Sequence, residues 1–211
     1  MAYSGNLMDP NEDLYTLDYY LRLAERIVDA GAHVLAIKDM AGILTPYTAF
    51  ELVSRLKASL AIPIHMQCHA TAGLSSVAIL KAVEAGIDNV DTAISSLSMT
   101  YGHSPTESVV AMFQGTERDT GLDIAAIRQL SDYWEGVRAQ YAAFEAGMQA
   151  PASEVYLHEM PGGQFTNLKA QARSLGLEDR WPEIAQAYAD ANQMFGDIVK
   201  VTPSSKVVGD M

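Results

Sequence analysis

Short apolar runs alternate with segments of helical periodicity over the first half of the chain, and this alternation limits the possible folds more than any other feature. One helical segment opens at Thr45-Pro46, a cap residue followed by proline. Strict alternation predicts right-handed βαβ units and a parallel sheet, and therefore the α/β class. The expected helices lie at 15–30, from 45 onward and at 74–85, and the expected strands at 33–39, from 63 onward and at 89–95. Residues 2–5 are typical of the last residues of a strand.

The alternation ends near residue 105, and the remaining sequence has mostly helical periodicity. We expect an α/β region at residues 1–115 and a helical region at 116–211. The expected helices lie at 106–113, 125–145, 164–175 and 182–194, followed by a short strand or extended piece at 197–203. Three complete strands and a strand end are fewer than the eight of a closed barrel. The sheet is therefore expected to be small and open, or part of a larger one.

Charge and cysteine content exclude several classes of function. The chain has 26 acidic against 14 basic residues, a net charge of -12, which argues against a nucleic-acid surface and against binding to anionic lipid. The single cysteine excludes an intrachain disulfide and favours a reducing compartment. No apolar run reaches the ~20 residues of a membrane span, and the N-terminus lacks the pattern of a signal peptide. We expect a cytoplasmic protein.

Polar side chains stand at the end of the strand that begins at Pro63. His65, Gln67 and His69 should share one face, with Met66 and Cys68 on the other. Two imidazoles on one face, with an amide between them, can converge on one metal ion, but an amide oxygen is a poor zinc ligand. The alternative is a polar strand end hydrogen-bonded to loop backbone. Cys68 is expected to pack as an inert side chain.

Lys38 and Asp39 end the preceding apolar run. Burial favours the neutral amine of a lysine, which can form a Schiff base or react with carbon dioxide to give a carbamate that binds metal. The alternative is a lysine that extends out to solvent. Asp39 is expected either to support such a site or to cap the turn at 40–42.

Three further segments carry polar or glycine-rich motifs. His103 lies in a polar loop, where a hydrogen-bonding role is sufficient. Two glycines in MPGGQFTNL (160–168) precede a helix, so they either present amides to an anion or allow the chain to reverse. The segment VTPSSK (201–206) is typical of a helix cap followed by proline.

Several of these motifs together resemble one enzyme family. The segments AIKDMAG, PIHMQCHATAG, GIDNVDTAIS, SEVYLHEMPGGQFTNL and ANQMFGDIVKVTPSSKVVGDM closely resemble the carboxyltransferase domain of pyruvate carboxylase and the related α subunit of oxaloacetate decarboxylase. The resemblance covers essentially the whole chain. It implies an α/β fold of the TIM-barrel type, with about the last four βα units present, followed by a mostly helical extension that closes over the barrel mouth.

The resemblance also implies roles for individual residues. Lys38 matches a carbamylated lysine that binds the active-site metal, zinc or manganese. Gln67 and His69 match the family's two histidine ligands, so the first is replaced here by glutamine. Thr202 matches the threonine that passes a proton between pyruvate and biotin.

The family's first four strands, which carry an aspartate ligand and substrate-binding residues, have no counterpart in this sequence. The resemblance therefore implies part of a biotin-dependent carboxyltransferase acting on pyruvate and oxaloacetate, a part expected to be inactive alone. Its expected partners are a biotinyl carrier domain and either the N-terminal half of the barrel or a second copy of the chain. The alternatives are a decarboxylase α-subunit fragment and a non-catalytic remnant or assembly piece.

Overall fold

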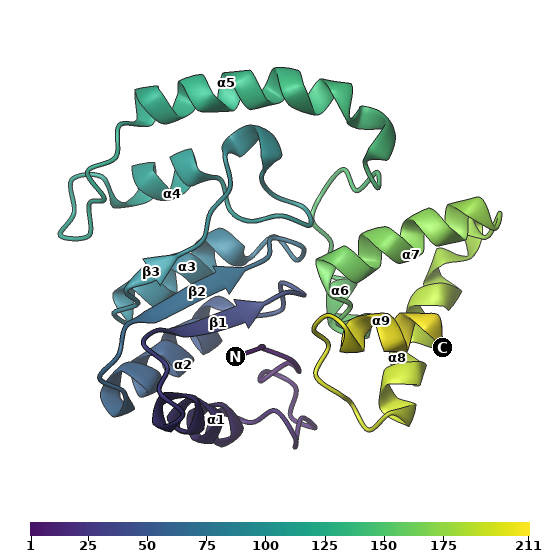
Figure 1. The fold of residues 1–211 in the computed structure, drawn as a ribbon, viewed down its shortest axis with the longest axis horizontal. Coiled ribbons are helices and arrows are strands. Elements are labelled where there is room, and N and C mark those ends of the chain that lie inside the picture. Colours follow the sequence, from purple (N-terminus) through teal and green to yellow (C-terminus); the bar gives the residue numbers. More distant parts are fainter.

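A computed structural model describes all residues from Met1 to Met211, and its centre is a three-stranded parallel sheet. The strands β1 (Leu35–Asp39), β2 (Ile64–Cys68) and β3 (Asn89–Val90) lie side by side in that order. Helices α2 (Pro46–Ser59) and α3 (Ser75–Glu84) connect them (Figure 1). The predicted α/β alternation is confirmed.

The N-terminal residues run parallel to β1. Lys38 N donates to Met1 O at 2.8 Å, and Tyr3 N donates to Lys38 O at 2.8 Å. Ala2 forms a parallel bridge with Lys38. Of the residues 2–5 that were predicted to be extended, only the first ones pair with β1, and they cover its outer edge.

One face of the sheet is buried under helices. Alternate strand residues such as Ile37, Ile64 and Met66 point into a core of 23 buried residues. Helices α2, α3 and α1 (Leu17–Asp29) contribute their apolar stripes to the same core. Their burial on this side leaves Lys38, His65 and Gln67, which are only partly buried, on the opposite face.

The third strand is shorter than predicted. Residues 89–95 were expected to be extended, but pairing with β2 ends after Val90. The backbone of Ala93 instead bonds to the loop at 104–106, because Ala93 N donates to Ser104 O at 3.0 Å and Thr106 N donates to Ala93 O at 2.8 Å. Ser95–Leu97 then forms a 3-10 turn.

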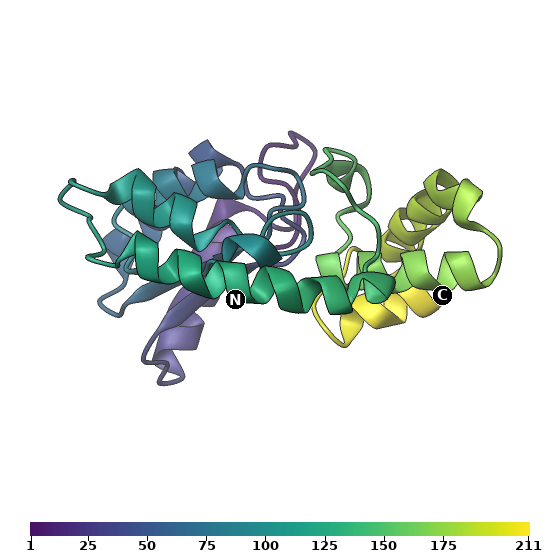
Figure 2. The same cartoon turned by 90° about the horizontal axis from the view of Figure 1, so that it is seen from above.

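The second half of the chain is helical, as predicted. Its helices are α4 (Thr106–Phe113), α5 (Ile124–Gln140), α6 (Val155–His158), α7 (Gly162–Ser174), α8 (Trp181–Met194) and α9 (Ser204–Asp210), with short 3-10 turns at Ala142–Phe144 and Glu178–Arg180. The expected helix at 125–145 ends at Gln140, and residues 197–203 form no strand. Helix α5 lies along the outside of the molecule (Figure 2). None of the helices is both long and apolar enough to cross a membrane.

Helices α7, α8 and α9 pack around a second, smaller core. It holds seven buried residues, among them Met160, Phe165, Trp181 and Val208. This helical unit stands opposite the carboxyl ends of β1 and β2 (Figure 1). The boundary predicted near residue 115 remains a prediction.

Candidate active site

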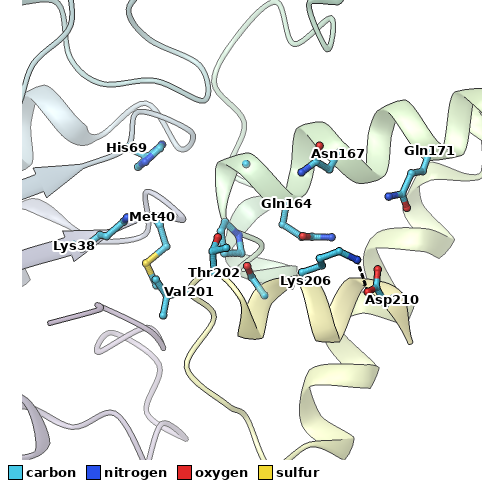
Figure 3. Close-up of a pocket in the computed structure, with 13 residues that line it drawn as sticks. Lys38, Met40, His69, Gln164, Asn167, Gln171, Val201, Thr202, Lys206 and Asp210 are labelled. Atoms are coloured by element: carbon cyan, nitrogen blue, oxygen red, sulfur yellow. Dashed lines mark hydrogen bonds and ion pairs between the residues drawn. The ribbon is translucent and has the colours of Figure 1, made fainter.

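A polar cavity of about 480 Å³ lies between the sheet and the helical unit. Lys38 and His69 line it from the strand ends, and Gln164 and Asn167 line it from α7. Thr202 and Lys206 line it from the C-terminal segment (Figure 3). Polar groups at the carboxyl ends of parallel strands are positioned as in α/β enzymes.

Lys38 and Gln67 lie in register on adjacent parallel strands. Paired residues of a parallel ladder point to the same face, so both side chains stand on the face away from the core. Lys38 reaches the cavity, whereas Gln67 is half-buried and is not among the residues that line it. The predicted strand-end lysine therefore has access to a ligand.

His69 follows β2 and is held by the backbone. Its Nδ1 contacts the carbonyl oxygen of Tyr101, and a carbonyl only accepts, so Nδ1 carries the proton. Burial lowers the pKa of His69 to about 4. The ring is neutral at pH 7, and its Nε2 keeps a lone pair that can bind a metal.

His103 packs against His69. The two ring centroids are 4.7 Å apart, and the two residues form an antiparallel bridge. His103 Nε2 is buried and has no hydrogen-bond partner. Burial lowers the pKa of this imidazole also. Sequence reasoning gave His103 only a loop role, because nothing in the sequence indicates that this loop folds back onto the end of β2.

His65 does not join this pair, although it shares a face with His69 as predicted. Its Nε2 lies 2.7 Å from Asp91 Oδ1, which occupies that nitrogen. The chain gathers no group of three or more histidine, cysteine, aspartate or glutamate side chains placed to bind a metal. The donors that remain are the two imidazoles of His69 and His103, and neutral imidazole nitrogen suits zinc. The lysine amine suits a metal only after conversion to a carbamate.

Asp39 caps the turn after β1, which was one of its two predicted roles. Its carboxylate accepts from the amides of Gly42, Ile43 and Leu44 at 2.9, 3.1 and 2.8 Å. The Cys68 thiol donates to it at 3.3 Å. Burial raises the pKa of Asp39 to about 6 and raises that of Cys68. A thiol with a raised pKa is a poor nucleophile, in agreement with the inert role predicted for Cys68.

The predicted presentation of an amide to an anion does not hold for Gly162, whereas Gly163 lines the cavity. The glycine pair opens α7, where Gly162 N donates to Met40 O at 2.9 Å, so this amide is not free for an anion. A Cβ at Gly162 would lie 3.2 Å from Tyr101 O and 3.3 Å from His69 Nδ1. Gly162 therefore allows α7 to approach the His69–Tyr101 contact closely.

Thr202 stands on the opposite wall from His69 and is exposed. The turn before α9 is closed by Ser204, whose Oγ accepts from Val201 N at 3.1 Å. The sequence motif does precede a helix, as predicted, but the proline stands at the N-cap and Ser204 opens α9. The Thr202 hydroxyl is thereby left at the cavity instead of capping the helix.

A buried ion-pair cluster holds the segment that carries Thr202. Lys200 is only 2% exposed, and its Nζ lies 3.0 Å from Glu159 Oε2 and 3.1 Å from Asp197 Oδ1. Tyr15 Oη donates to Asp197 O at 2.5 Å, which ties the cluster to the chain before α1. Sequence reasoning missed this cluster, because its members are far apart in sequence.

Several other cavity residues were also missed. Gln164, Asn167 and Gln171 line the cavity from one face of α7, and their spacing of three and four residues was the available signal. Lys206 and Asp210 form an ion pair one turn apart on α9.

Two family models match different parts of the chain. The family described as HMGL-like matches residues 11–133, and the family described as a conserved carboxylase domain matches residues 155–211. The pyruvate carboxylase of Bacillus subtilis is 47% identical over 211 residues, and human mitochondrial pyruvate carboxylase is 45% identical over 214 residues. The chain is covered completely in both matches, but it spans only 18% of either relative.

Solved structures give the same result. The carboxyl transferase domain of Rhizobium etli pyruvate carboxylase matches with a TM-score of 0.97 and 57% identity, over 100% of this chain and 36% of that one. A second structure of this domain, solved with pyruvate and biocytin, matches with the same score and identity over 35% of its length.

Proposed function

Because the chain belongs to the HMGL-like family, and within it to the carboxyltransferase domain of pyruvate carboxylases, we propose that it forms part of a biotin-dependent carboxyltransferase site. The reaction moves a carboxyl group from carboxybiotin to pyruvate, which gives oxaloacetate. In the reverse direction, oxaloacetate returns the carboxyl group to biotin. The carboxyl transferase domain of Rhizobium etli pyruvate carboxylase has been solved with pyruvate, with oxalate, and with pyruvate and biocytin, which supports a small keto acid and a biotinyl group as ligands.

One observation carries this proposal: Lys38 and His69 line the same cavity as Thr202, from the opposite wall (Figure 3). A group on the helical unit can therefore act on a ligand held at the strand ends. The cavity wall between them is polar, as a keto acid and a ureido ring require. Gln164, Asn167, Ser205 and Lys206 supply hydrogen-bond donors there.

Thr202 is the residue that moves the proton. Carboxybiotin, when bound, supplies the carboxyl group. The hydroxyl of Thr202 both donates and accepts a proton, so Oγ1 can take a proton from the methyl carbon of pyruvate while its own proton passes to the biotin ureido nitrogen that has released the carboxyl group. Its position on a segment anchored by Lys200 keeps this hydroxyl in place.

Lys38 and His69 are the residues that would hold the metal, with Gln67 beside them. The amine of Lys38 would do so as a carbamate, whose oxygens are hard donors. A divalent zinc or manganese ion held by these residues would supply Lewis-acid polarisation of a keto oxygen or would organise the site. Lys38 would thus hold the metal on one wall of the cavity, and Thr202 transfers the proton from the opposite wall.

We propose that the sheet is part of a TIM-type barrel of which this chain holds about the last four βα units. The parallel order β1-β2-β3 and the edge position of residues 1–3 support this. The partners are then the remaining barrel strands and a biotinyl carrier domain. The proposed division lies near residue 115, and the residues of the separate core around α7, α8 and α9 follow it from Met160 onward.

The test supplies the remaining part of a carboxyltransferase domain as a second polypeptide. The mixture, with biotin and Zn²⁺ or Mn²⁺, is assayed for decarboxylation of oxaloacetate to pyruvate. We expect turnover that requires both polypeptides. A mixture that assembles but shows no biotin-dependent turnover would contradict the proposal and support a non-catalytic assembly piece.

A further inference from the structure

Two neighbouring imidazoles near the cavity end in nitrogens that nothing in the chain occupies. His69 gives its Nδ1 proton to the backbone of Tyr101, which leaves Nε2 available. His103 Nε2 is buried without a partner, which is costly unless something binds it. The rings belong to different segments, the end of β2 and the loop after β3, and a backbone bridge holds them together.

The spacing of the two rings suits a shared metal ion. A tetrahedral zinc ion holds two nitrogen ligands about 3.4 Å apart, since each Zn–N bond is about 2.1 Å long. Ring centroids 4.7 Å apart allow two imidazole nitrogens to reach that separation. The hydrogen bond from His69 to a carbonyl is also the kind of contact that fixes the tautomer of a metal-binding histidine.

The neighbouring donors are already engaged. His65 is paired with Asp91, and Cys68 donates to Asp39. Asp39 itself accepts three backbone amides. Gln67 offers only an amide, which is a weak zinc ligand. Apart from the amine of Lys38, the imidazole nitrogens of His69 and His103 are therefore the donors left for a metal in this part of the site.

We propose that His103 is a metal ligand that acts with His69, so that the loop after β3 supplies the second imidazole that position 67 lacks. The proposal rests on the proposed function only for the presence of a metal beside Lys38. It makes the loop at 100–105 part of the site.

The experiment measures Zn²⁺ binding to the tag-free chain by calorimetry, with Co²⁺ absorption as a second readout of coordination. We expect the wild type to bind one Zn²⁺ and His103→Gln to bind it at least about tenfold more weakly. Even the loss of a residue that only hydrogen-bonds to a metal ligand lowers metal affinity by about that factor. The exposed residue His33 provides the matched control, and His33→Gln should bind as the wild type does. Circular dichroism confirms that each variant is folded.

A double variant keeps the test decisive if His103→Gln alone disturbs the loop. Gln67→His combined with His103→Gln returns an imidazole to the same face of β2 and should recover Zn²⁺ affinity. Wild-type affinity in His103→Gln, or no Zn²⁺ binding by the wild type, would overturn the proposal.

Failure here is distinguishable from failure of the proposed function. If the two-polypeptide assay shows biotin-dependent turnover and His103→Gln keeps the Zn²⁺ affinity of the wild type, only the proposal that His103 is a metal ligand fails. If His103→Gln loses Zn²⁺ binding but the wild-type mixture shows no turnover, only the proposed carboxyl-transfer reaction fails, and the ligand role of His103 stands.

Discussion

Lys200 Nζ lies 3.0 Å from Glu159 Oε2, and this buried pair joins two segments that form the cavity wall. Glu159 immediately precedes the turn that opens α7, and Lys200 stands two residues before Thr202. Asp197 supplies a second carboxylate at 3.1 Å. The position of Thr202 relative to α7 therefore depends on one buried ammonium group.

Replacing that ammonium should destabilise the protein strongly. Lys200→Met leaves two largely buried carboxylates without their partner, at a cost of about 3–5 kcal/mol in the free energy of unfolding. Lys200→Arg, which keeps the charge, should lose less. Urea denaturation of the three proteins measures this, and equal stability of Lys200→Met and wild type would show that the cluster does not hold the wall.

A methyl group at Gly162 should disturb His69. Its Cβ would lie 3.3 Å from His69 Nδ1, so Gly162→Ala must displace either α7 or the imidazole. Gly163 is the matched control, because a Cβ there has nothing within 4 Å. We expect Gly162→Ala to weaken Zn²⁺ binding, and Gly163→Ala to leave it unchanged and to stabilise the helix slightly. Equal Zn²⁺ affinities of the two variants would argue against close packing at this point.

The free energy of unfolding should decrease as pH is lowered, and part of this decrease should come from His158. Its Nδ1 accepts from Met160 N at 2.9 Å, and burial lowers its pKa to about 4 from 6.5. His158 therefore binds a proton near pH 6.5 in the unfolded chain but only near pH 4 in the folded chain. Its contribution to the free energy of unfolding is fully present above pH 6.5 and is lost as pH falls toward 4.

His158→Gln removes this contribution. Between pH 6.5 and 4 the variant should lose stability less steeply than wild type, by at most about 1.4 kcal/mol per pH unit. His69 acts in the same direction, and Asp39, with its raised pKa, acts in the opposite one. These two groups are present in both proteins, so the difference in urea midpoints isolates His158. Parallel pH profiles would contradict the assignment.

Bicarbonate should strengthen metal binding through Lys38. Carbon dioxide converts a neutral amine to a carbamate, which adds an oxygen donor, whereas a guanidinium does not react. We expect Zn²⁺ affinity to rise with added bicarbonate in the wild type and to stay constant in Lys38→Arg. Carbon-13 NMR with labelled bicarbonate detects the carbamate directly, and a signal that persists in Lys38→Arg would place it on another amine.

The sequence predicts the sheet and one wall of the site, and the structure explains what it misses. Lys38 and His69 end apolar runs, and parallel strands bring such ends together whatever surrounds them. The length of β3 could not be predicted, because Ala93 exchanges its sheet partners for the loop at 104–106. His103 and Lys200 owe their positions to contacts between distant segments, which no local pattern reveals. Thr202 was found through the family resemblance alone.

The most direct test of the account compares Thr202→Val with Thr202→Ser in the two-polypeptide assay of biotin-dependent oxaloacetate decarboxylation. Valine keeps the shape of threonine without the hydroxyl, and serine keeps the hydroxyl. If Thr202 moves the proton across this cavity, Thr202→Val should lose at least about 100-fold in rate, and Thr202→Ser should retain most of it. Equal rates for Thr202→Val and the wild type would contradict the account.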